Sequence, residues 1–193
     1  MSNIYFTSDT HFGHPNIVGP NVSRWKSGYR TFDSLHEMNK TLINNINKTV
    51  QWDDTLYHLG DWSFRESPKK YRDQINCRNI HIITGNHDSI SRLEGNFSSI
   101  QSEKFLKIDD ILIFMHHYAH RVWPSSHHGS FHLYGHSHGS ISNDWGRSTD
   151  VGVDMAYKLL EEYRPFSWAE VKQILLPRPI KVVDHHHHKK IEV

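Results

Sequence analysis

Five short polar clusters in this sequence combine the side chains that bind divalent metal ions. They hold aspartate, asparagine and histidine at close spacing: Asp9-x-His11, Gly60-Asp61, Gly85-Asn86-His87-Asp88, His116-His117 and Gly135-His136-x-His138. Carboxylate, amide and imidazole ligands together suit manganese, iron, zinc, cobalt or nickel, whereas calcium prefers more oxygen ligands. Any one cluster alone is weak evidence, because such short patterns often arise by chance. Five of them in one chain predict a metal centre.

Histidine is also unusually abundant. The chain holds 18 histidines among 193 residues, and eight of them fall between His116 and His138. Histidine is the commonest metal ligand and titrates near neutral pH, so this density indicates metal or acid-base chemistry. A solvated, histidine-rich loop is the alternative. Four of the 18, His185–His188, belong either to a native charged end or to an added tag, and neither interpretation concerns the fold.

Each of the first three clusters directly follows a segment that is typical of a β-strand. These segments are Ile4–Thr7, Thr55–Leu59 and Asn79–Thr84, all short runs rich in β-branched and other apolar residues. Predicted helices separate them, which indicates parallel pairing. Because the carboxyl ends of parallel strands meet at one edge of a sheet, we expect the clusters to converge in one crevice there.

The spacing inside the clusters is consistent with ligands that share one site. On an extended strand, residues i and i+2 project to the same face. The side chains of each pair could therefore point into one site: Asp9 with His11, and His136 with His138. The glycines of three clusters allow sharp exits and a close approach of the backbone to a bound anion: Gly60, Gly85 and Gly135.

Two helices are expected between these strands. Apolar residues recur at the helical period over Thr31–Val50, which predicts an amphipathic helix capped by Thr31 or Asp33. Ser67-Pro68 is typical of an N-cap followed by proline in the first turn, and predicts a second helix that reaches about Asn76.

The second half of the chain is expected to consist mostly of strands. A hairpin that turns at Asp109-Asp110 is followed by two more strands, and the expected ranges are Lys104–Ile108, Ile111–Met115, Phe131–Tyr134 and Asp150–Val153. Ser167-Trp-Ala-Glu170 is a capping box that predicts a final helix through Leu176. Together, these elements predict an α/β fold with two mixed sheets and helices outside.

Taken in order, the five clusters resemble the signature blocks of the calcineurin-like metallophosphoesterases. The blocks span residues 9 to 138, and Asp150-Val-Gly-Val-Asp154 resembles the strand that follows them in small bacterial and phage members. The resemblance implies a four-layer α/β/β/α sandwich of two mixed sheets flanked by helices. It also implies a single metallophosphoesterase domain over 1–176, with a C-terminal tail over 177–193.

The resemblance further implies two divalent metal ions, with manganese favoured over iron, zinc, nickel or cobalt. The residues that would hold the first ion are Asp9, His11, Asp61 and His138, and Asp61 would bridge to the second, which Asn86, His117 and His136 would complete. His117 is favoured over His116 because Tyr118 continues the His-Tyr pair common in this branch. Ala119 departs from the proline that usually follows.

The implied reaction is hydrolysis of a phosphate ester. Two ions about 3.5 to 4 Å apart would acidify a bridging water, and the hydroxide left after loss of its proton would attack phosphorus in line. His87 is the candidate general acid for the leaving oxygen. Asp88 either orients His87 or caps a following helix at Ser89 or Ile90.

Two further residues are candidates for binding the substrate. A guanidinium suits phosphate, which favours Arg121, although a surface charge is the alternative. His14 either faces the phosphate or stabilises its loop. The aromatic rings that could stack on a nucleobase are expected more often to close a small core: Phe12, Trp123 and Trp145.

The predicted substrate is a small, nucleotide-like phosphodiester or phosphomonoester. Gly60-Asp61-Trp-Ser-Phe-Arg departs from the pattern of serine/threonine protein phosphatases. A nuclease is the alternative enzyme, but 22 basic against 21 acidic residues offer no basic track. A catalytically inert metal-binding scaffold is the alternative of a different class; it would be expected to lack His87 or Asp61.

The composition also indicates in which compartment the protein works. No stretch approaches the ~20 apolar residues of a membrane span, and the first residues do not resemble a secretory signal. Cys77 is the only cysteine, which excludes an internal disulfide. We therefore expect a cytoplasmic protein with no membrane partner; the sequence leaves its oligomeric state open.

Overall fold

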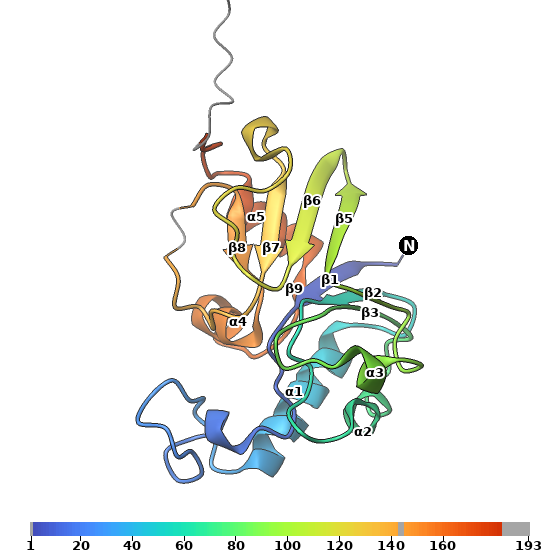
Figure 1. The fold of residues 1–193 in the computed structure, drawn as a ribbon, viewed down its shortest axis with the longest axis vertical. Coiled ribbons are helices and arrows are strands. Elements are labelled where there is room, and N and C mark those ends of the chain that lie inside the picture. Colours follow the sequence, from blue (N-terminus) through green and yellow to red (C-terminus); the bar gives the residue numbers. More distant parts are fainter. Residues whose placement is uncertain (1, 143–144, 183–193) are drawn as a thin grey trace, which may run out of the picture.

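Two β-sheets face each other across an apolar core (Figure 1). The structure is a computed structural model that describes residues 2–142 and 145–182. The strands are β1 (Ile4–Thr7), β2 (Thr55–His58), β3 (Asn79–Ile83), β4 (Ser99–Gln101), β5 (Glu103–Ile108), β6 (Ile111–His116), β7 (Phe131–Tyr134), β8 (Ser148–Asp150) and β9 (Phe166–Ser167). The first sheet has the order β4-β3-β2-β1-β9, and the second has the order β5-β6-β7-β8.

Both sheets are mixed. In the first, β1 to β4 pair in parallel and β9 joins β1 in the antiparallel direction. In the second, β6 to β8 pair in parallel and β5 forms the expected antiparallel hairpin with β6. The expected fold class, an α/β sandwich of two mixed sheets flanked by helices, is therefore confirmed.

Of the expected strand Asp150–Val153, only Asp150 lies in a strand. β8 ends at Asp150, whose Oδ1 accepts a hydrogen bond from the Gly152 N–H at 2.7 Å and so stabilises a turn. Val153 then begins a helix that was not expected. β4 and β9 were also missed, because strands of 3 and 2 residues carry too little pattern.

The helices of the described residues lie outside the sheets or at their ends (Figure 1). They are α1 (Leu35–Thr49), α2 (Pro68–Arg72), α3 (Ile90–Leu93), α4 (Val153–Leu160) and α5 (Trp168–Leu175). None of them is long and apolar enough to cross a membrane. α5 begins with the expected capping box, in which the Ser167 and Glu170 side chains each accept a hydrogen bond from the other residue's backbone N–H.

Two helix boundaries differ from the expectation. The N-cap of α1 is Ser34, whose side chain accepts from the Glu37 N–H, so neither Thr31 nor Asp33 caps it. Instead, the Glu37 carboxylate accepts from the Asp33 N–H at 2.9 Å. α2 starts at Ser67-Pro68 as expected but ends at Arg72, because the following residues turn toward α1.

The alternation of side chains along the first sheet creates two cores. Side chains on its outer face, such as Leu56 and Ile82, pack against Met38 of α1. Their neighbours on the inner face, such as Tyr57, pack with apolar residues of the second sheet, such as Phe131. The two sheets are therefore packed against each other, and this packing positions the loops at their ends.

Part of the predicted tail lies against the second sheet. The Arg178 guanidinium donates to the Ser148 carbonyl, and the Arg147 Nε–H donates to the Arg178 carbonyl at 3.3 Å. Residues 183–193 of the predicted tail, with the four consecutive histidines, lie outside the described residues.

A buried histidine lies on the outer face of the second sheet. His132 is fully buried; its Nε2 accepts from the His120 N–H at 3.0 Å, and its Nδ1 lies 3.2 Å from the Phe114 carbonyl oxygen, to which it donates. Trp123 covers it at a ring distance of 5.4 Å. Burial lowers the pKa of His132 to about 3, so the ring stays neutral in the folded protein at neutral pH.

The folded protein is expected to lose stability as the pH falls below about 6.5. In the unfolded chain His132 binds a proton near that pH, whereas in the folded protein the buried ring stays neutral down to about pH 3. His132→Gln should lower the free energy of unfolding at pH 7.5. Between pH 6 and pH 4, that free energy should also depend less steeply on pH, by up to about 1.4 kcal/mol per pH unit. Urea unfolding at several pH values measures this slope. The exposed His36→Gln is the control, and equal slopes in both variants would contradict the prediction.

Candidate metal centre

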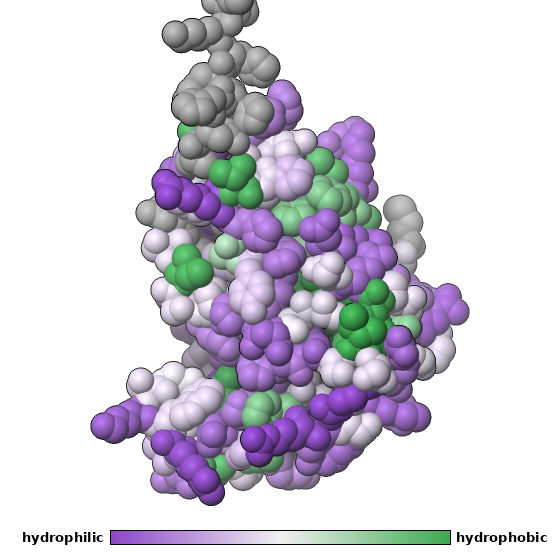
Figure 2. Space-filling model, viewed as in Figure 1, coloured by the Kyte–Doolittle hydropathy of each residue, from purple (hydrophilic) through white to green (hydrophobic). Residues whose placement is uncertain are grey.

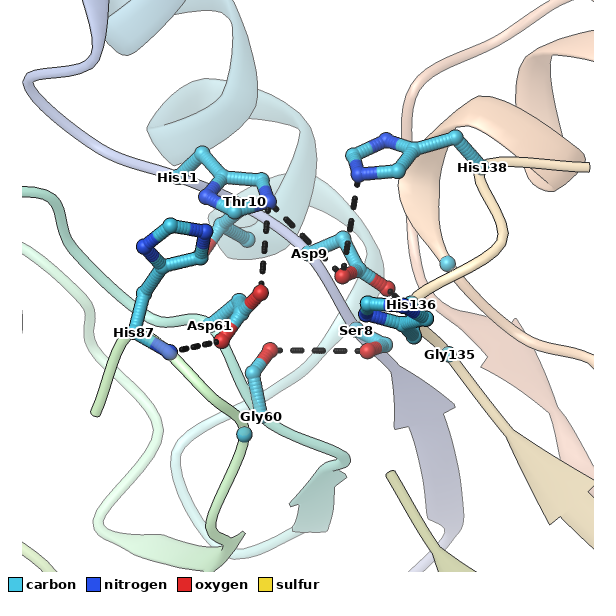
Figure 3. A network of polar contacts seen from close by, with 12 residues as sticks. Ser8, Asp9, Thr10, His11, Gly60, Asp61, His87, Gly135, His136 and His138 are labelled. Carbon is cyan, nitrogen blue, oxygen red and sulfur yellow. Dashed lines mark hydrogen bonds and ion pairs between the residues drawn. The ribbon is translucent and has the colours of Figure 1, made fainter. Parts of the chain in front are cut away.

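The five polar clusters meet where the two sheets converge. β1, β2 and β3 run in parallel, so the residues that follow them emerge at the same edge. β6 and β7 deliver the last two clusters to that edge from the second sheet. Figure 3 shows the rings of His11, His87 and His138 around the carboxylates of Asp9 and Asp61.

The seven ligand candidates form two sets. One contains Asp9, His11 and His138, and the other contains Asp61, His117 and His136; within each set the candidate ligand atoms lie within 4.8 Å of one another. Asn86 joins the second set, because its Oδ1 lies 3.1 Å from His117 Nε2 and 3.0 Å from His136 Nδ1.

Asp61 lies between the two sets. Its Oδ2 is 3.6 Å from His11 Nε2 and 3.5 Å from His117 Nε2. Its Oδ1 accepts a hydrogen bond from the His87 N–H at 2.8 Å, which holds the carboxylate in this orientation. Burial opposes ionisation, but the neighbouring His117 and His11 hold the pKa of Asp61 well below its usual range. An ionised carboxylate therefore faces both sets.

Asp9 shows that the site suits a cation. Its side chain is fully buried, and Oδ1 has no hydrogen-bond partner among the described residues. The atom lies 3.7 Å from His11 Nε2 and 3.9 Å from His138 Nε2. Burial raises the pKa of Asp9 to about 7. A buried, unpaired carboxylate oxygen is costly, and a divalent cation among these nitrogen and oxygen atoms would compensate it.

The backbone of these ligands adopts an unusual conformation. Asp9, His11, Asp61, His136 and His138 all have φ between 47° and 64°, in the left-handed region. Such residues cost on the order of 1 kcal/mol each and cluster at functional sites. Hydrogen bonds hold part of this arrangement, since the Asp9 N–H donates to the Gly60 carbonyl at 2.9 Å. The strained turns aim the side chains inward.

The glycines of the clusters leave room for these ligands. A Cβ on Gly135 would lie 1.9 Å from Ser8 Oγ and 2.5 Å from Asp9 Oδ2. At Gly60, where φ is +100°, a Cβ would lie 2.5 Å from His117 Nδ1. The backbone of one loop therefore packs directly on the ligands of the next.

Gly135→Ala is expected to weaken metal binding, because the added methyl group must displace Asp9. The overpacking should also cost about 1 to 3 kcal/mol of stability. Isothermal titration with Mn²⁺ and urea unfolding measure the two effects. Gly95→Ala is the control for an added methyl group without a clash, because its Cβ would meet nothing within 4 Å. Its φ of +75° makes backbone strain greater there than at Gly135, whose φ lies outside the left-handed region, so strain alone cannot explain a larger loss in Gly135→Ala. Parental Mn²⁺ affinity in Gly135→Ala would contradict the prediction.

Of the adjacent histidines, His117 faces the ligand sets. Its Nδ1 lies 2.7 Å from the Leu59 carbonyl oxygen, so an Nδ1–H donates there and Nε2 is left toward Asp61. Burial lowers its pKa, but Asp61 outweighs burial and raises the pKa to about 9. His116 instead accepts from the Tyr118 N–H and lies 3.1 Å from His120 Nε2.

Two residues that sequence reasoning missed orient His138. Asp154 Oδ2 lies 2.6 Å from His138 Nδ1, and Arg30 forms a bidentate pair with Asp154 at 2.8 and 2.9 Å. The Arg30 guanidinium is buried and also donates to the Thr10 carbonyl. A carboxylate behind a histidine fixes which nitrogen faces a metal, here Nε2. Asp154 stood in a quoted block; no local signal marked Arg30.

The structure places His87 above the ligands and gives Asp88 a different role. The exposed His87 ring lies 5.4 Å from the His11 ring. The Asp88 carboxylate accepts from the backbone N–H groups of Asp61, Trp62 and Gly85 at 2.7 to 3.1 Å. It therefore ties two ligand loops together, and the structure records neither a bond to the His87 ring nor a side-chain cap on α3.

The two candidates for substrate binding have different surroundings. His14 lies beside the ligands, with its ring 5.7 Å from His11, and its Nδ1 accepts from the Asn16 N–H, so it also stabilises the loop. Burial lowers the pKa of His14 to about 4. The Arg121 guanidinium lies over the Trp145 ring at 5.1 Å, and the structure records no contact between it and the ligand sets.

This sandwich, with its two sets of carboxylate and histidine ligands, defines a metal-binding α/β protein. Residues 3–151 match the family model of the calcineurin-like phosphoesterase superfamily domain. The chain belongs to this superfamily, as the resemblance of its clusters implied.

Known proteins extend the comparison. An uncharacterized protein of Methanocaldococcus jannaschii is 36% identical over 135 residues, which cover 63% of this chain and 73% of the relative. The crystal structure of a protein of unknown function from Aquifex aeolicus superposes with a TM-score of 0.63 at 21% identity, covering 91% of this chain and all of that one. The similarity to the Aquifex aeolicus structure shows that the two proteins share a fold.

Proposed function

We propose that this protein hydrolyses phosphodiester or phosphomonoester bonds of small, nucleotide-like substrates with the help of two divalent metal ions, manganese before iron, zinc, nickel or cobalt. The observation that carries the proposal is the pair of ligand sets joined at Asp61, with an unpaired, buried Asp9 oxygen beside it. We place the enzyme in the cytoplasm, because its single cysteine, Cys77, is free and buried.

Each residue of the site has a distinct role in the proposal. Asp9, His11 and His138 hold one ion, while Asn86, His117 and His136 hold the other, with Asp61 shared between them. Bound divalent ions would supply Lewis acidity toward the phosphoryl oxygens and toward the attacking water. Arg30 and Asp154 keep the Nε2 atom of His138 directed at Asp9.

His87 is the proposed proton donor. Its ring stands at the exposed rim, 5.4 Å from the His11 ring, and no contact in the structure assigns it to either ligand set. A leaving alkoxide needs a proton, and a positioned histidine supplies one near neutral pH. The backbone N–H of His87 meanwhile holds Asp61, so the acid and the shared ligand are aligned by one residue.

The test is hydrolysis after metal removal and reloading. The protein is treated with EDTA, reloaded with Mn²⁺, and assayed on bis-p-nitrophenyl phosphate and p-nitrophenyl phosphate, with metal content measured by mass spectrometry. We expect activity that requires about two ions per chain. Full metal loading without activity on either ester would favour the inert scaffold. Activity confined to an oligonucleotide, assayed as a third substrate, would favour the nuclease.

A further inference from the structure

An exposed tryptophan stands next to the candidate metal centre. Trp25 is 46% exposed, and its ring lies 5.4 Å from that of His14 at an angle of 71°. His14 stacks flat on Phe64 at 3.8 Å and lies 5.7 Å from His11. A line of aromatic rings therefore runs outward from a ligand candidate and ends in Trp25.

The loop that carries Trp25 is held in place by hydrogen bonds. The Trp25 N–H donates to Ser23 Oγ at 3.0 Å, and that hydroxyl donates to the Asn16 carbonyl at 2.6 Å. The Arg24 N–H donates to Asn16 Oδ1 at 3.3 Å. The tryptophan is therefore presented to solvent on a tethered backbone. An exposed aromatic ring beside the candidate metal centre offers a flat face on which a planar ligand can stack.

The charge around Trp25 suits an anionic ligand. Residues 10–32 contain no aspartate or glutamate but three basic residues, of which Arg24 and Lys26 flank Trp25 and are exposed. The exposed Arg65 places its guanidinium 5.1 Å from the Phe64 ring. The segment between β1 and α1 projects from one end of the molecule (Figure 1), and that end carries strongly hydrophilic side chains (Figure 2).

The three rings named above as possible stacking partners, which were expected more often to close a core, have other surroundings. Phe12 is fully buried and Trp123 is 6% exposed, so both belong to the packed interior. The Trp145 ring already has two cations over it, those of Arg121 and Lys181, at 5.1 and 5.7 Å. Of these aromatic candidates and Trp25, only Trp25 combines exposure with contact to a residue beside the ligands.

We propose that Trp25 forms a nucleobase subsite: the base joined through its sugar to the scissile phosphate stacks on Trp25, while Arg24 and Lys26 offset phosphate charge. The proposal rests on the proposed function for the position of the phosphate. Base stacking on an aromatic side chain tolerates any base, because each base offers a π-face. The subsite therefore selects for a nucleoside and not for a particular sequence.

The kinetic test compares a substrate that has bases with one that has none. For adenylyl-adenosine and glycerophosphoethanolamine, Trp25→Ala should lower the ratio of the two kcat/KM values about tenfold, mainly through KM. Trp25→Phe should recover most of the ratio. Trp52→Ala, which removes a 61% exposed tryptophan before β2, is the matched control. An unchanged ratio in Trp25→Ala would overturn the subsite, and so would a parent enzyme that hydrolyses only the baseless ester.

A binding measurement separates the subsite from the proposed function. The emission of 2-aminopurine riboside monophosphate is quenched when its base stacks, and titration of the parent protein, with and without Mn²⁺, should quench it. Quenching that persists in Trp52→Ala and is lost in Trp25→Ala supports the subsite even if every hydrolysis assay fails. Equal quenching by both variants, or none by the parent, overturns it.

Isothermal titration identifies where the nucleoside comes from. Adenylyl-adenosine and an oligoadenylate are titrated separately into the parent and into Trp25→Ala. Tighter binding of the oligonucleotide by the parent would point to the end of a nucleic acid, and equal binding would point to a dinucleotide. Either result supports the subsite only where Trp25→Ala weakens binding, and undiminished binding by that variant overturns it.

Discussion

His87→Asn is expected to lower kcat by about 10²- to 10⁴-fold while leaving the metal content unchanged. The imidazole stands at the exposed rim and belongs to neither ligand set, whereas the backbone N–H of His87, which the substitution keeps, holds Asp61 Oδ1 at 2.8 Å. The variant therefore loses a proton donor and retains the ligands. Steady-state kinetics combined with metal analysis by mass spectrometry measures both quantities.

The leaving group gives this prediction a sharper form. A nitrophenolate departs without protonation, but an alkoxide needs a proton from the enzyme. The loss in His87→Asn should therefore be much smaller for p-nitrophenyl esters than for an ester with an alkyl leaving group. The exposed His36→Asn is the control. An equal loss on both kinds of ester, or a loss of metal, would show that His87 acts in some other way.

Asp61→Asn is expected to abolish binding of both ions and to lower kcat/KM at least about a thousandfold. Asp61 Oδ2 lies 3.6 Å from His11 Nε2 and 3.5 Å from His117 Nε2, so one oxygen serves both sets. In the amide, the oxygen can still accept from the His87 N–H, but the NH₂ group then faces those imidazole nitrogens. The substitution therefore removes both the negative charge of Asp61 and the oxygen that the two ligand sets share.

Equilibrium dialysis against Mn²⁺, followed by metal analysis, measures this loss. Asp53→Asn is the matched control, because the Asp53 side chain is 71% exposed and pairs with Arg78 at the surface. Two ions bound with parental affinity in Asp61→Asn would contradict the shared position of this carboxylate. Loss of only one ion would assign Asp61 to a single set.

Local patterns allowed much of the fold to be predicted. The capping box at Ser167 and the proline after Ser67 place helix starts correctly, because both signals involve neighbouring residues only. Strand ends followed by polar clusters likewise predict where the ligand candidates gather, since parallel strands deliver them to one edge.

The features that were missed depend on distant partners. Arg30 is held in position by Asp154, 124 residues away, and no local sequence pattern indicates that the two residues pair. Asp88 follows the candidate acid directly, which suggested a role in orienting it, yet its carboxylate reaches back 27 residues to the Asp61 backbone. Solvent exposure distinguishes Trp25 from the buried Trp123 as a stacking candidate, and the positions of the two residues in the sequence do not indicate their exposure.

The two sheets each contribute donor atoms to both ligand sets. Asp9 and His11 follow the first sheet's β1, while His136 and His138 follow the second sheet's β7, and Asp9 already accepts a hydrogen bond from the backbone of His136, 127 positions along the chain. An ion in either set would thus act as a removable cross-link between the halves of the sandwich. Its concentration would then set the thermal tolerance of the protein as well as its turnover.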